Sequence, residues 1–227
     1  MSTLCTICAR GGSTGLPRKN IKTLAGKPLI AHTIAQALVT PGIDRVVVST
    51  DDDEIAAIAR EHGAEVPFRR PAELSTSSAP KLPVIRHAVE TMEQLGMKVD
   101  RIVDLDPTSP LRLVQDVIEC LALLDATVDV VITGYPSEKN PYFNMIERKP
   151  DGNIGLIVPG RGTASRQAAP PVWSMNASVY VWHRSTLELG LWDGRVRLHV
   201  MPRERSIDID SALDFRLVEM LMAEAEK

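Results

Sequence analysis

Aromatic residues are scarce in this sequence, which has three Trp, three Tyr and three Phe, or 4% of its 227 residues. Proteins that grip single-stranded nucleic acid stack the bases on aromatic side chains, so the scarcity argues against that class. The formal net charge of −3 argues against a strongly basic nucleic-acid surface as well. We therefore expect no nucleic-acid partner.

Long apolar runs are also missing. No run approaches the roughly 18 residues that a membrane span needs. The N-terminus leads directly into the apolar segment Leu4–Ala9, without the charged flank and long apolar core of a signal peptide. We expect no membrane partner and a cytoplasmic location. With 44% hydrophobic and 24% charged residues, the composition suits one globular domain, or one domain with a subdomain.

The three cysteines are Cys5, Cys8 and Cys120, and the first two form a C-x-x-C pattern that is typical of redox or zinc sites. The surrounding apolar run predicts a strand, in which residues three apart point to opposite faces. The two sulfurs then cannot share a metal or a disulfide, and no second Cys or Cys/His pair completes a zinc site. We interpret all three as buried structural thiols.

Apolar strands alternate with amphipathic helices along the chain. We expect strands at Leu4–Ala9, Arg45–Ser49, Glu65–Phe68, Arg101–Leu105, Asp129–Thr133, Ala177–Trp182 and Arg197–Met201. We expect helices at Pro28–Val39, Asp52–His62, Val84–Leu95, Val114–Leu124 and Ser211–Ala225. This alternation predicts parallel pairing through right-handed crossovers. The fold class is therefore α/β, a three-layer sandwich with a mostly parallel sheet.

Residues 135–173 break the alternation, because six prolines from Pro136 to Pro171 leave no helical period. A disordered loop is one interpretation. The segment nevertheless contains Tyr142, Phe143 and Met145, which a solvated linker seldom carries. We favour an extended arm packed on another surface, such as a second subunit.

A glycine-rich basic loop follows the first expected strand. It contains Gly11, Gly12 and Gly15 together with Arg10, Arg18, Lys19 and Lys22. Glycines allow close backbone approach, so that consecutive amides can converge on an anion, and open α/β sheets bind ligands at this end of a strand. The order of residues matches neither a Walker A loop nor a dinucleotide fingerprint. It favours a loop wrapped over the phosphates of a nucleoside triphosphate; the alternative is a basic surface loop whose glycines only make turns.

Two acidic pairs and one acidic run are candidates for chemistry. Asp208 and Asp210 are two residues apart, which on an extended segment puts both carboxylates on one face, able to share a hard cation. The alternative is that Asp210 or Ser211 only caps the last helix. The run at residues 51–54 resembles a metal cluster, but it stands at an expected helix start, where carboxylates cap backbone amides. We favour capping for that run.

Asp104 and Asp106 share a face at the carboxyl end of an expected strand, and Asp106 is placed to hydrogen-bond a sugar hydroxyl or amide. The five histidines lack the i, i+4 partners of a helical metal site, so we interpret them as structural. The residues identify no general base.

The loop at residues 9–20 reads A-R-G-G-S-x-G-x-P-x-K-N and resembles the signature of the acylneuraminate cytidylyltransferases, the CMP-sialic acid synthetase family. The resemblance continues in order along nearly the whole chain. It is carried by S-T-D at 49–51, R-P-A-E-L at 70–74, P-T-S-P-L-R at 107–112, R-Q at 166–167 and S-I-D-I-D at 206–210. It implies the Rossmann-like fold of nucleotide-diphospho-sugar transferases, spanning 1–227. It also implies a homodimer, whose inserted arm at 135–173 reaches towards the partner's active site.

The resemblance further implies transfer of CMP from CTP to the anomeric hydroxyl of a nine-carbon α-keto acid sugar, with release of pyrophosphate. It implies dependence on Mg²⁺, with Mn²⁺ as a substitute. The implied catalytic residues are Arg10, Lys19, Asp208 and Asp210, of which Asp208 and Asp210 hold the metal. The implied nucleotide-binding residues are Cys8, Ala9, Arg10, Gly11, Gly12, Ser13, Lys19, Asn20, Ala79 and Lys81. The implied sugar-binding residues are Asp106, Thr108, Ser109, Arg166, Gln167, Asn176 and Tyr180.

Three departures from the sialic acid pattern bear on the acceptor. Thr14 stands where Lys is usual, Asp106 where Gln is common, and M-N-A-S at 175–178 replaces Asn-Gly-Ala. The last two, with the segments 79–83 and 140–144, resemble enzymes that activate N,N′-diacetyllegionaminic acid for bacterial surface glycans or flagellin. We expect that acceptor. The alternatives are sialic acid, another keto sugar such as Kdo, or a non-catalytic nucleotide-binding module, which the intact basic and acidic residues disfavour.

Overall fold

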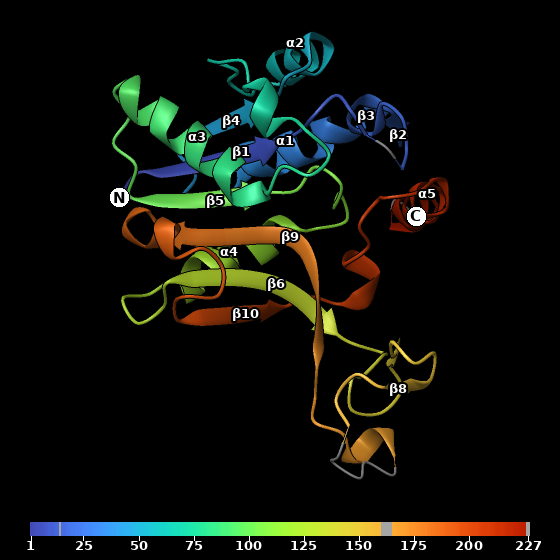
Figure 1. Ribbon diagram of the computed structural model, residues 1–227. Coiled ribbons are helices and arrows are strands. Elements are labelled where there is room, and N and C mark those ends of the chain that lie inside the picture. Colours follow the sequence, from blue (N-terminus) through green and yellow to red (C-terminus); the bar gives the residue numbers. More distant parts are fainter. Residues whose placement is uncertain (14, 160–164, 226–227) are drawn as a thin grey trace.

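The computed structural model describes residues 1–13, 15–159 and 165–225. A six-stranded sheet, in the order β10-β6-β9-β5-β1-β4, forms its centre (Figure 1). The strands are β1 (Thr3–Cys8), β4 (Arg45–Ser49), β5 (Arg101–Leu105), β6 (Val130–Pro136), β9 (Trp173–His183) and β10 (Val196–Val200). Their apolar, β-branched composition suits strands that are covered on both faces.

The sheet is mostly parallel, as predicted. β1 pairs in parallel with β4 and β5, and β10 pairs in parallel with β6. β9 lies between β5 and β6 and runs antiparallel to both, so it is the strand that departs from the parallel pairing. The cause is the connection: its described parts, residues 137–159 and 165–172, hold a small hairpin and a short helix in place of a crossover helix, and the chain returns in the opposite direction.

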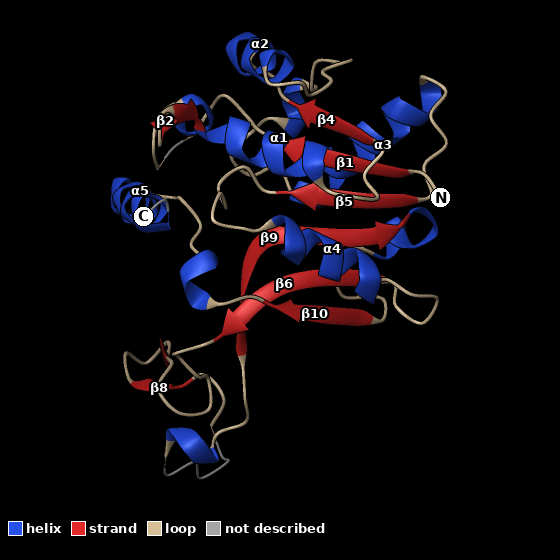
Figure 2. Ribbon diagram, turned by 180° about the vertical axis from the view of Figure 1, so that it is seen from behind, coloured by secondary structure: helices blue, strands red, loops and turns tan. Residues whose placement is uncertain are grey.

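Helices cover both faces of the sheet, giving the predicted three layers. In Figure 2, α1 (Leu29–Val39) and α4 (Val114–Leu123) lie over one face, and α2 (Asp53–Glu61) packs on the same core beyond β4. α3 (Lys81–Gln94) covers the opposite face, where Ile85 and Val89 meet Ile102 and Trp182. Two hydrophobic cores therefore sandwich the sheet.

The cysteines lie as the alternation of strand side chains predicts. Cys5 belongs to the core under α1 and α4, whereas Cys8 packs against the core under α3. All three thiols are free, and burial raises the pKa of each. The C-x-x-C spacing therefore brings no sulfurs together.

Helix α2 confirms the capping interpretation of the acidic run. The Asp52 carboxylate accepts hydrogen bonds from the backbone amides of Glu54 and Ile55, both at 3.0 Å. Gly63, with φ of +91°, follows the end of the helix. The acidic residues here stabilise a helix start.

One predicted strand is absent, and several boundaries differ: β9 begins four residues before the predicted Ala177, and β6 extends three residues beyond the predicted Thr133. The segment 65–68 is no strand, since only Glu65 makes a bridge, to Val47. Helix α3 begins at Lys81, three residues before the predicted start, because Pro80 precedes it and Pro83 lies in the first turn, where a missing N–H costs nothing. The earlier start places Lys81 at the carboxyl-end side of the sheet.

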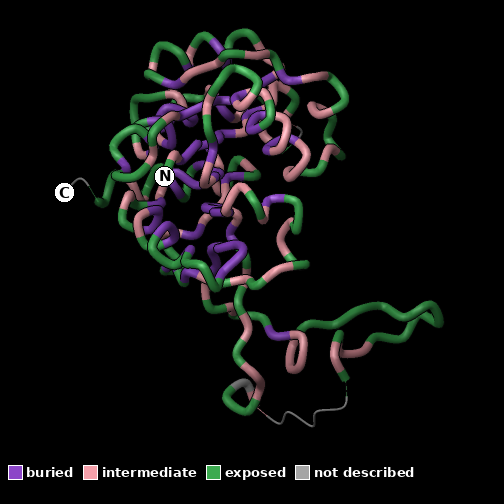
Figure 3. Tube along the Cα trace, turned by 90° about the vertical axis from the view of Figure 1, so that its left-hand side faces the viewer, coloured by how far each residue is buried: buried purple, intermediate pink, exposed green. Residues whose placement is uncertain are grey.

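The Pro-rich segment projects from the main domain, as the tube in Figure 3 shows. It contains a two-stranded hairpin of β7 (Ile146–Arg148) and β8 (Ile154–Leu156), and the short helix η3 (Arg166–Ala168). Its apolar side chains are poorly covered: Ile146 is 58% and Ile154 64% exposed. The part within 160–164 lies outside the described residues. The dimerisation role of this segment stays a prediction.

A third, smaller core fixes the C-terminal part. The hairpin β2 (Thr23–Leu24) and β3 (Lys27–Pro28) packs on α5 (Ala212–Ala225) through Leu24, Phe215 and Val218, with Ile209 between them. The remaining short helices are η1 (Lys19–Ile21), η2 (Ala72–Leu74), η4 (Arg184–Leu189) and η5 (Arg203–Arg205). No helix in the described part of the chain combines the length and hydrophobicity that a bilayer span requires.

Candidate active site

Three chain segments meet beyond the carboxyl ends of β1 and β5: the glycine-rich loop, residues 106–108, and residues 208–210. They enclose a cleft of about 380 Å³. Its lining consists of Cys8, Arg10, Ser13, Gly15, Lys19, Asn20, Asp106, Pro107, Thr108, Asp208 and Asp210. Nine of the residues predicted for nucleotide, sugar, catalytic or metal roles therefore line one cavity, at the edge where open α/β sheets bind ligands.

The glycine loop is packed tightly against two acidic segments. The Gly11 amide donates to Asp51 Oδ1 at 3.0 Å, and a Cβ at Gly11 would lie 2.7 Å from Asp52 Oδ2. A Cβ at Gly15 would lie 2.4 Å from the Asp210 carbonyl oxygen. Glycine at these positions lets the loop approach both α2 and the 208–210 segment. Thr14, between them, lies outside the described residues.

Side chains of the loop hold it in place and leave one polar atom for a ligand. Arg18 pairs with the carboxylates of Asp52 and Glu54. Asn20 is buried and donates through Nδ2 to the Arg10 carbonyl oxygen at 3.0 Å. Its buried Oδ1 has no hydrogen-bond partner among the described residues. An orphaned acceptor of this kind suits a ligand hydroxyl or amine, in keeping with the predicted nucleotide role.

Arg10 connects the glycine loop to the segment before α3. Its Nη1 donates to the Thr76 carbonyl oxygen at 2.7 Å. The Ala79 amide in turn donates to the same carbonyl oxygen at 3.3 Å. The predicted nucleotide residue Ala79 thus lies in a loop held against the glycine loop, although it does not line the cleft.

The acidic side of the cleft has more carboxylates than nearby basic side chains to neutralise them. Thr108 Oγ1 contacts the carboxylates of both Asp106, at 2.7 Å, and Asp208. Burial, with the negative charges of Asp106 and Asp210, raises the pKa of Asp208 from 3.8 to about 6. Asp210 is largely exposed and pairs with Lys19 at 3.0 Å.

These two aspartates fit the predicted metal. Mg²⁺ in enzymes that handle phosphates takes one or two carboxylates and completes its shell with phosphate oxygens and water. Asp208 and Asp210 line the cleft together, and the raised pKa of Asp208 marks a site where added positive charge is favourable. Among the described residues, no group of three or more His, Cys, Asp or Glu could hold an ion.

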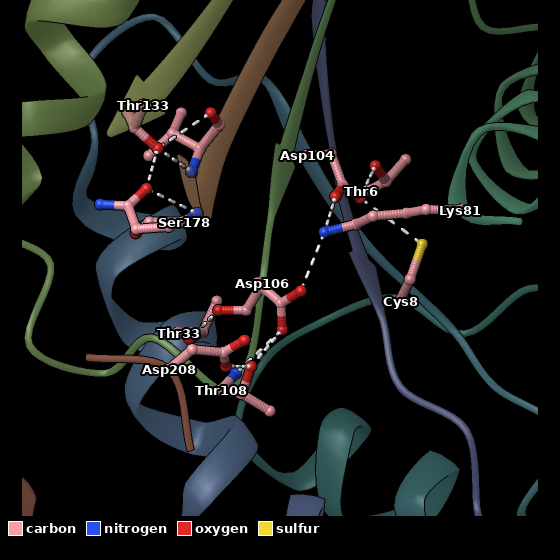
Figure 4. Close-up of polar contacts among 12 residues, drawn as sticks. Thr6, Cys8, Thr33, Lys81, Asp104, Asp106, Thr108, Thr133, Ser178 and Asp208 are labelled. Atoms are coloured by element: carbon pink, nitrogen blue, oxygen red, sulfur yellow. Dashed lines mark hydrogen bonds and ion pairs between the residues drawn. The ribbon is translucent and has the colours of Figure 1, made fainter. Parts of the chain in front are cut away.

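Beside the cleft lies a chain of three charged side chains, shown in Figure 4. Lys81 Nζ is 2.9 Å from Asp104 Oδ2 and 2.9 Å from Asp106 Oδ2. Asp104 is fully buried and also accepts from Thr6 Oγ1 at 2.8 Å. Burial alone would raise the pKa of Asp106, but Lys81 and the hydrogen bonds from Thr108 outweigh it and lower that pKa from 3.8 to about 2. Asp106 is therefore ionised at neutral pH.

Several predicted residues lie away from the cleft. Ala9 and Ser109 are buried beneath it, and Tyr180 is buried on the α3 side of the sheet, stacked on Trp182. Asn176 is also buried: Thr133 Oγ1 donates to its Oδ1 at 2.6 Å, and its Nδ2 donates to Ser206 Oγ at 2.9 Å. It thereby ties β9 to the segment that leads to Asp208.

The remaining predicted positions lie on loops. Gly12 is exposed in the glycine loop, and a Cβ there would meet nothing within 4 Å. Arg166 and Gln167 lie on η3 in the projecting arm; Gln167 is exposed, and the Arg166 side chain is outside the described set. The sugar-binding roles assigned to Arg166, Gln167 and Asn176 stay predictions.

The sequence analysis missed Arg112, which supports the cleft from below. Arg112 is 1% exposed. It donates to the Ser178 carbonyl oxygen at 2.7 Å, and to Thr33 Oγ1 and Gln36 Oε1, each at 3.1 Å. The signal that could have identified it is its place in the motif at 107–112. A buried arginine needs several hydrogen-bond partners, so an arginine there is a candidate anchor for the surrounding segments. It anchors the loop that carries Asp106 and Thr108.

Comparisons with known proteins agree with this geometry. Residues 4–120 match the family described as "Cytidylyltransferase". "Post-translational flagellin modification protein B" of Campylobacter coli is 39% identical over 97% of this chain and 95% of its own length. "CMP-N,N'-diacetyllegionaminic acid synthase" of Campylobacter jejuni is 38% identical over 97% of this chain and 94% of its own.

A solved structure of a CMP:2-keto-3-deoxy-manno-octonic acid synthetase complexed with CTP superposes with a TM-score of 0.72. The superposition covers 99% of this chain and 100% of that one, at 18% identity, so it supports the fold alone. The family match and the near full-length relatives establish the kinship. The chain belongs to the cytidylyltransferase family of nucleotidyltransferases.

Proposed function

We propose that this protein transfers CMP from CTP to the anomeric hydroxyl of a nonulosonic acid, with N,N′-diacetyllegionaminic acid as its acceptor. The observation that carries the proposal is the single cleft in which Arg10 and Lys19 face Asp208 and Asp210. The acceptor is favoured by Asp106, which stands where sialic acid enzymes commonly have Gln, and by the relative that is named for this acid.

The triphosphate would lie along the glycine loop. Backbone amides of that loop and the cations of Arg10 and Lys19 suit phosphate oxygens. The free Oδ1 of Asn20 suits a hydroxyl or amine of the nucleoside. Asp208 and Asp210 would hold Mg²⁺, which supplies neutralisation of phosphate charge when it is bound.

The reaction exchanges one phosphorus–oxygen bond for another. The anomeric oxygen of the acceptor attacks the α-phosphorus of CTP, and the bond to the β-phosphate breaks, with its electron pair leaving on pyrophosphate. The proton of the anomeric hydroxyl passes to water as the new bond forms. Lys19 and Arg10 stabilise the charge that develops on the leaving pyrophosphate, because both line the same cleft.

On the acceptor side, Asp106 and Thr108 carry the recognition. An ionised carboxylate only accepts hydrogen bonds, so Asp106 pairs with O–H or N–H groups of the sugar. A Gln at this position would present a donor as well as an acceptor. The difference is one way in which the site could separate related acids.

We also propose that two copies pair through the arm at 135–173 and that the protein acts in the cytoplasm. The exposed Ile146, Ile154 and Trp173 support the pairing, since apolar side chains exposed on a projecting segment and at its base favour burial against another chain. Sedimentation of the intact protein tests it. A monomer that remains fully active at high dilution would contradict a shared site.

The experiment that tests the function is a pyrophosphate-release assay with CTP and Mg²⁺. The panel is N,N′-diacetyllegionaminic acid, N-acetylneuraminic acid and Kdo, with a reaction lacking acid as the control. We expect kcat/KM to be at least about ten-fold higher for the first acid, because specificity resides in that ratio. A higher ratio for N-acetylneuraminic acid would assign the protein to sialic acid activation instead. Release with no acid, despite CTP binding, would contradict the proposal.

A further inference from the structure

Asp104 is a fully buried carboxylate, and it has no direct role in the proposed reaction. A buried charge is costly unless it is paired, so its partner is informative. That partner is Lys81, the first residue of α3, at 2.9 Å from Asp104 Oδ2. Asp104 therefore determines where the Lys81 ammonium lies.

From that position Lys81 reaches the cleft through Asp106. Its Nζ lies 2.9 Å from Asp106 Oδ2 and 4.9 Å from the centre of the Tyr180 ring. The other oxygen, Asp106 Oδ1, accepts from the Thr108 amide at 3.1 Å and from Thr108 Oγ1 at 2.7 Å. Both oxygens of Asp106 are thus held before any substrate arrives (Figure 4).

The contacts of Lys81 connect it to the acceptor side of the cleft. Within the described residues, its charged and aromatic partners stand on β5, at the end of β5 and on β9, and Lys81 does not line the cleft. The resemblance implied a nucleotide-binding role for this residue. The arrangement of its partners instead connects it to the carboxylate on the acceptor side.

We propose that Lys81, held by the buried Asp104, is a positioning residue for the acceptor sugar and acts through Asp106. The proposal rests on the proposed function, because it needs the acceptor site beside Asp106. A carboxylate clamped by Lys81 and Thr108 offers its remaining lone pairs in one fixed direction. A substrate donor then meets an oriented acceptor and spends less binding energy on ordering it.

The test compares KM for the acid with KM for CTP in Lys81→Met and in the double variant Lys81→Met/Asp104→Asn. The double variant removes the buried charge together with its partner, so it stays folded even if the single variant does not. In both variants, we expect KM for the acid to rise at least about ten-fold and KM for CTP to change less than about two-fold. The reason is that the substitutions weaken binding of the acid and leave binding of CTP intact. The matched control is Lys98→Met, which removes a lysine that pairs with Asp100 at 3.3 Å on the surface.

A double-mutant cycle tests whether Lys81 acts through Asp106. Asp106→Asn by itself removes the charge that Lys81 holds. If Lys81 works through that carboxylate, Lys81→Met in the Asp106→Asn background adds little to the increase in KM for the acid. Effects that multiply independently would overturn the proposal.

The outcomes distinguish this inference from the proposed function. Absence of turnover by the unmodified enzyme with every acid would count against the function itself. Normal turnover, with an unchanged KM for the acid in the double variant, would overturn the role of Lys81 alone. An increase in KM for CTP as large as that for the acid would make Lys81 a nucleotide ligand, and an equal effect in Lys98→Met would make the change non-specific.

Discussion

Replacing Asp208 by Asn should stabilise the ligand-free protein while it abolishes activity. The cause is the raised pKa of Asp208, which burial and the neighbouring Asp106 and Asp210 bring from 3.8 to about 6. The folded protein thus disfavours the ionised form of this carboxyl. Asn at this position has no charge to disfavour, and its Oδ1 can still accept the hydrogen bond from Thr108.

The sign and size of the stability change follow from the linkage between proton binding and folding. Because the pKa in the folded state lies above that in the unfolded chain, ionisation of Asp208 costs stability. The cost is small below about pH 4, grows between about pH 4 and 6, and is complete above about pH 7. A pKa of about 6 instead of 3.8 corresponds to at most about 3 kcal/mol, at about 1.4 kcal/mol per unit. Partial exposure of Asp208 lowers this to about 1–2 kcal/mol.

Thermal unfolding in EDTA at several pH values measures the effect. At pH 8, Asp208→Asn should unfold about 2–6 °C above the unmodified protein, and near pH 4.5 the two should differ by less than about 2 °C. Asp210→Asn is the matched control, because its carboxylate is 77% exposed and should shift Tm little. With CTP and Mg²⁺ present, the unmodified protein should have the higher Tm, since only it gains full stabilisation from the bound ligands. A Tm difference that is the same at every pH, or a lower Tm of Asp208→Asn at pH 8, would show that the charge on Asp208 does not destabilise the folded protein.

Four further outcomes are expected. Gly15→Ala should lower kcat/KM for CTP at least about ten-fold, because the new Cβ would lie 2.4 Å from the Asp210 carbonyl oxygen. Gly12→Ala is the control: a Cβ there would meet nothing within 4 Å, and kcat/KM for CTP should change less than about two-fold. Arg112→Lys should lower the free energy of unfolding by about 2–4 kcal/mol in urea titrations, since a lysine cannot serve Ser178, Thr33 and Gln36 together. Ala177→Gly should raise the free energy of unfolding by about 1 kcal/mol, because Ala177 has φ of +54°. Removal of divalent ions with EDTA should stop pyrophosphate release, and added Mg²⁺ should restore it.

The main elements of the fold were predictable because strands and helices have distinct apolar periods. The direction of β9 was not, since periodicity is the same for parallel and antiparallel strands and the arm that reverses the chain carries no such signal. The start of α3 was placed too late because Pro80 and Pro83 act as breakers inside a helix but are tolerated at its beginning.

For the site, ordered motifs predicted nine of the eleven residues that line the cleft, from Cys8 to Asp210. They could not predict that Lys81 joins Asp104 to Asp106. Lys81 and Asp106 are 25 positions apart, and they meet only because α3 covers this face of the sheet. Burial, which makes the pairing of Asp104 necessary, is likewise a property of the folded sheet.

The central claim is that CMP passes from CTP to a nonulosonic acid. The most direct measurement is the simultaneous quantification of CMP-sugar and pyrophosphate when the protein is incubated with CTP, Mg²⁺ and N,N′-diacetyllegionaminic acid. We expect both products in equal amounts, and neither when the acid is omitted. Pyrophosphate without a CMP-sugar, or no reaction with any such acid by a folded protein that binds CTP, would contradict it.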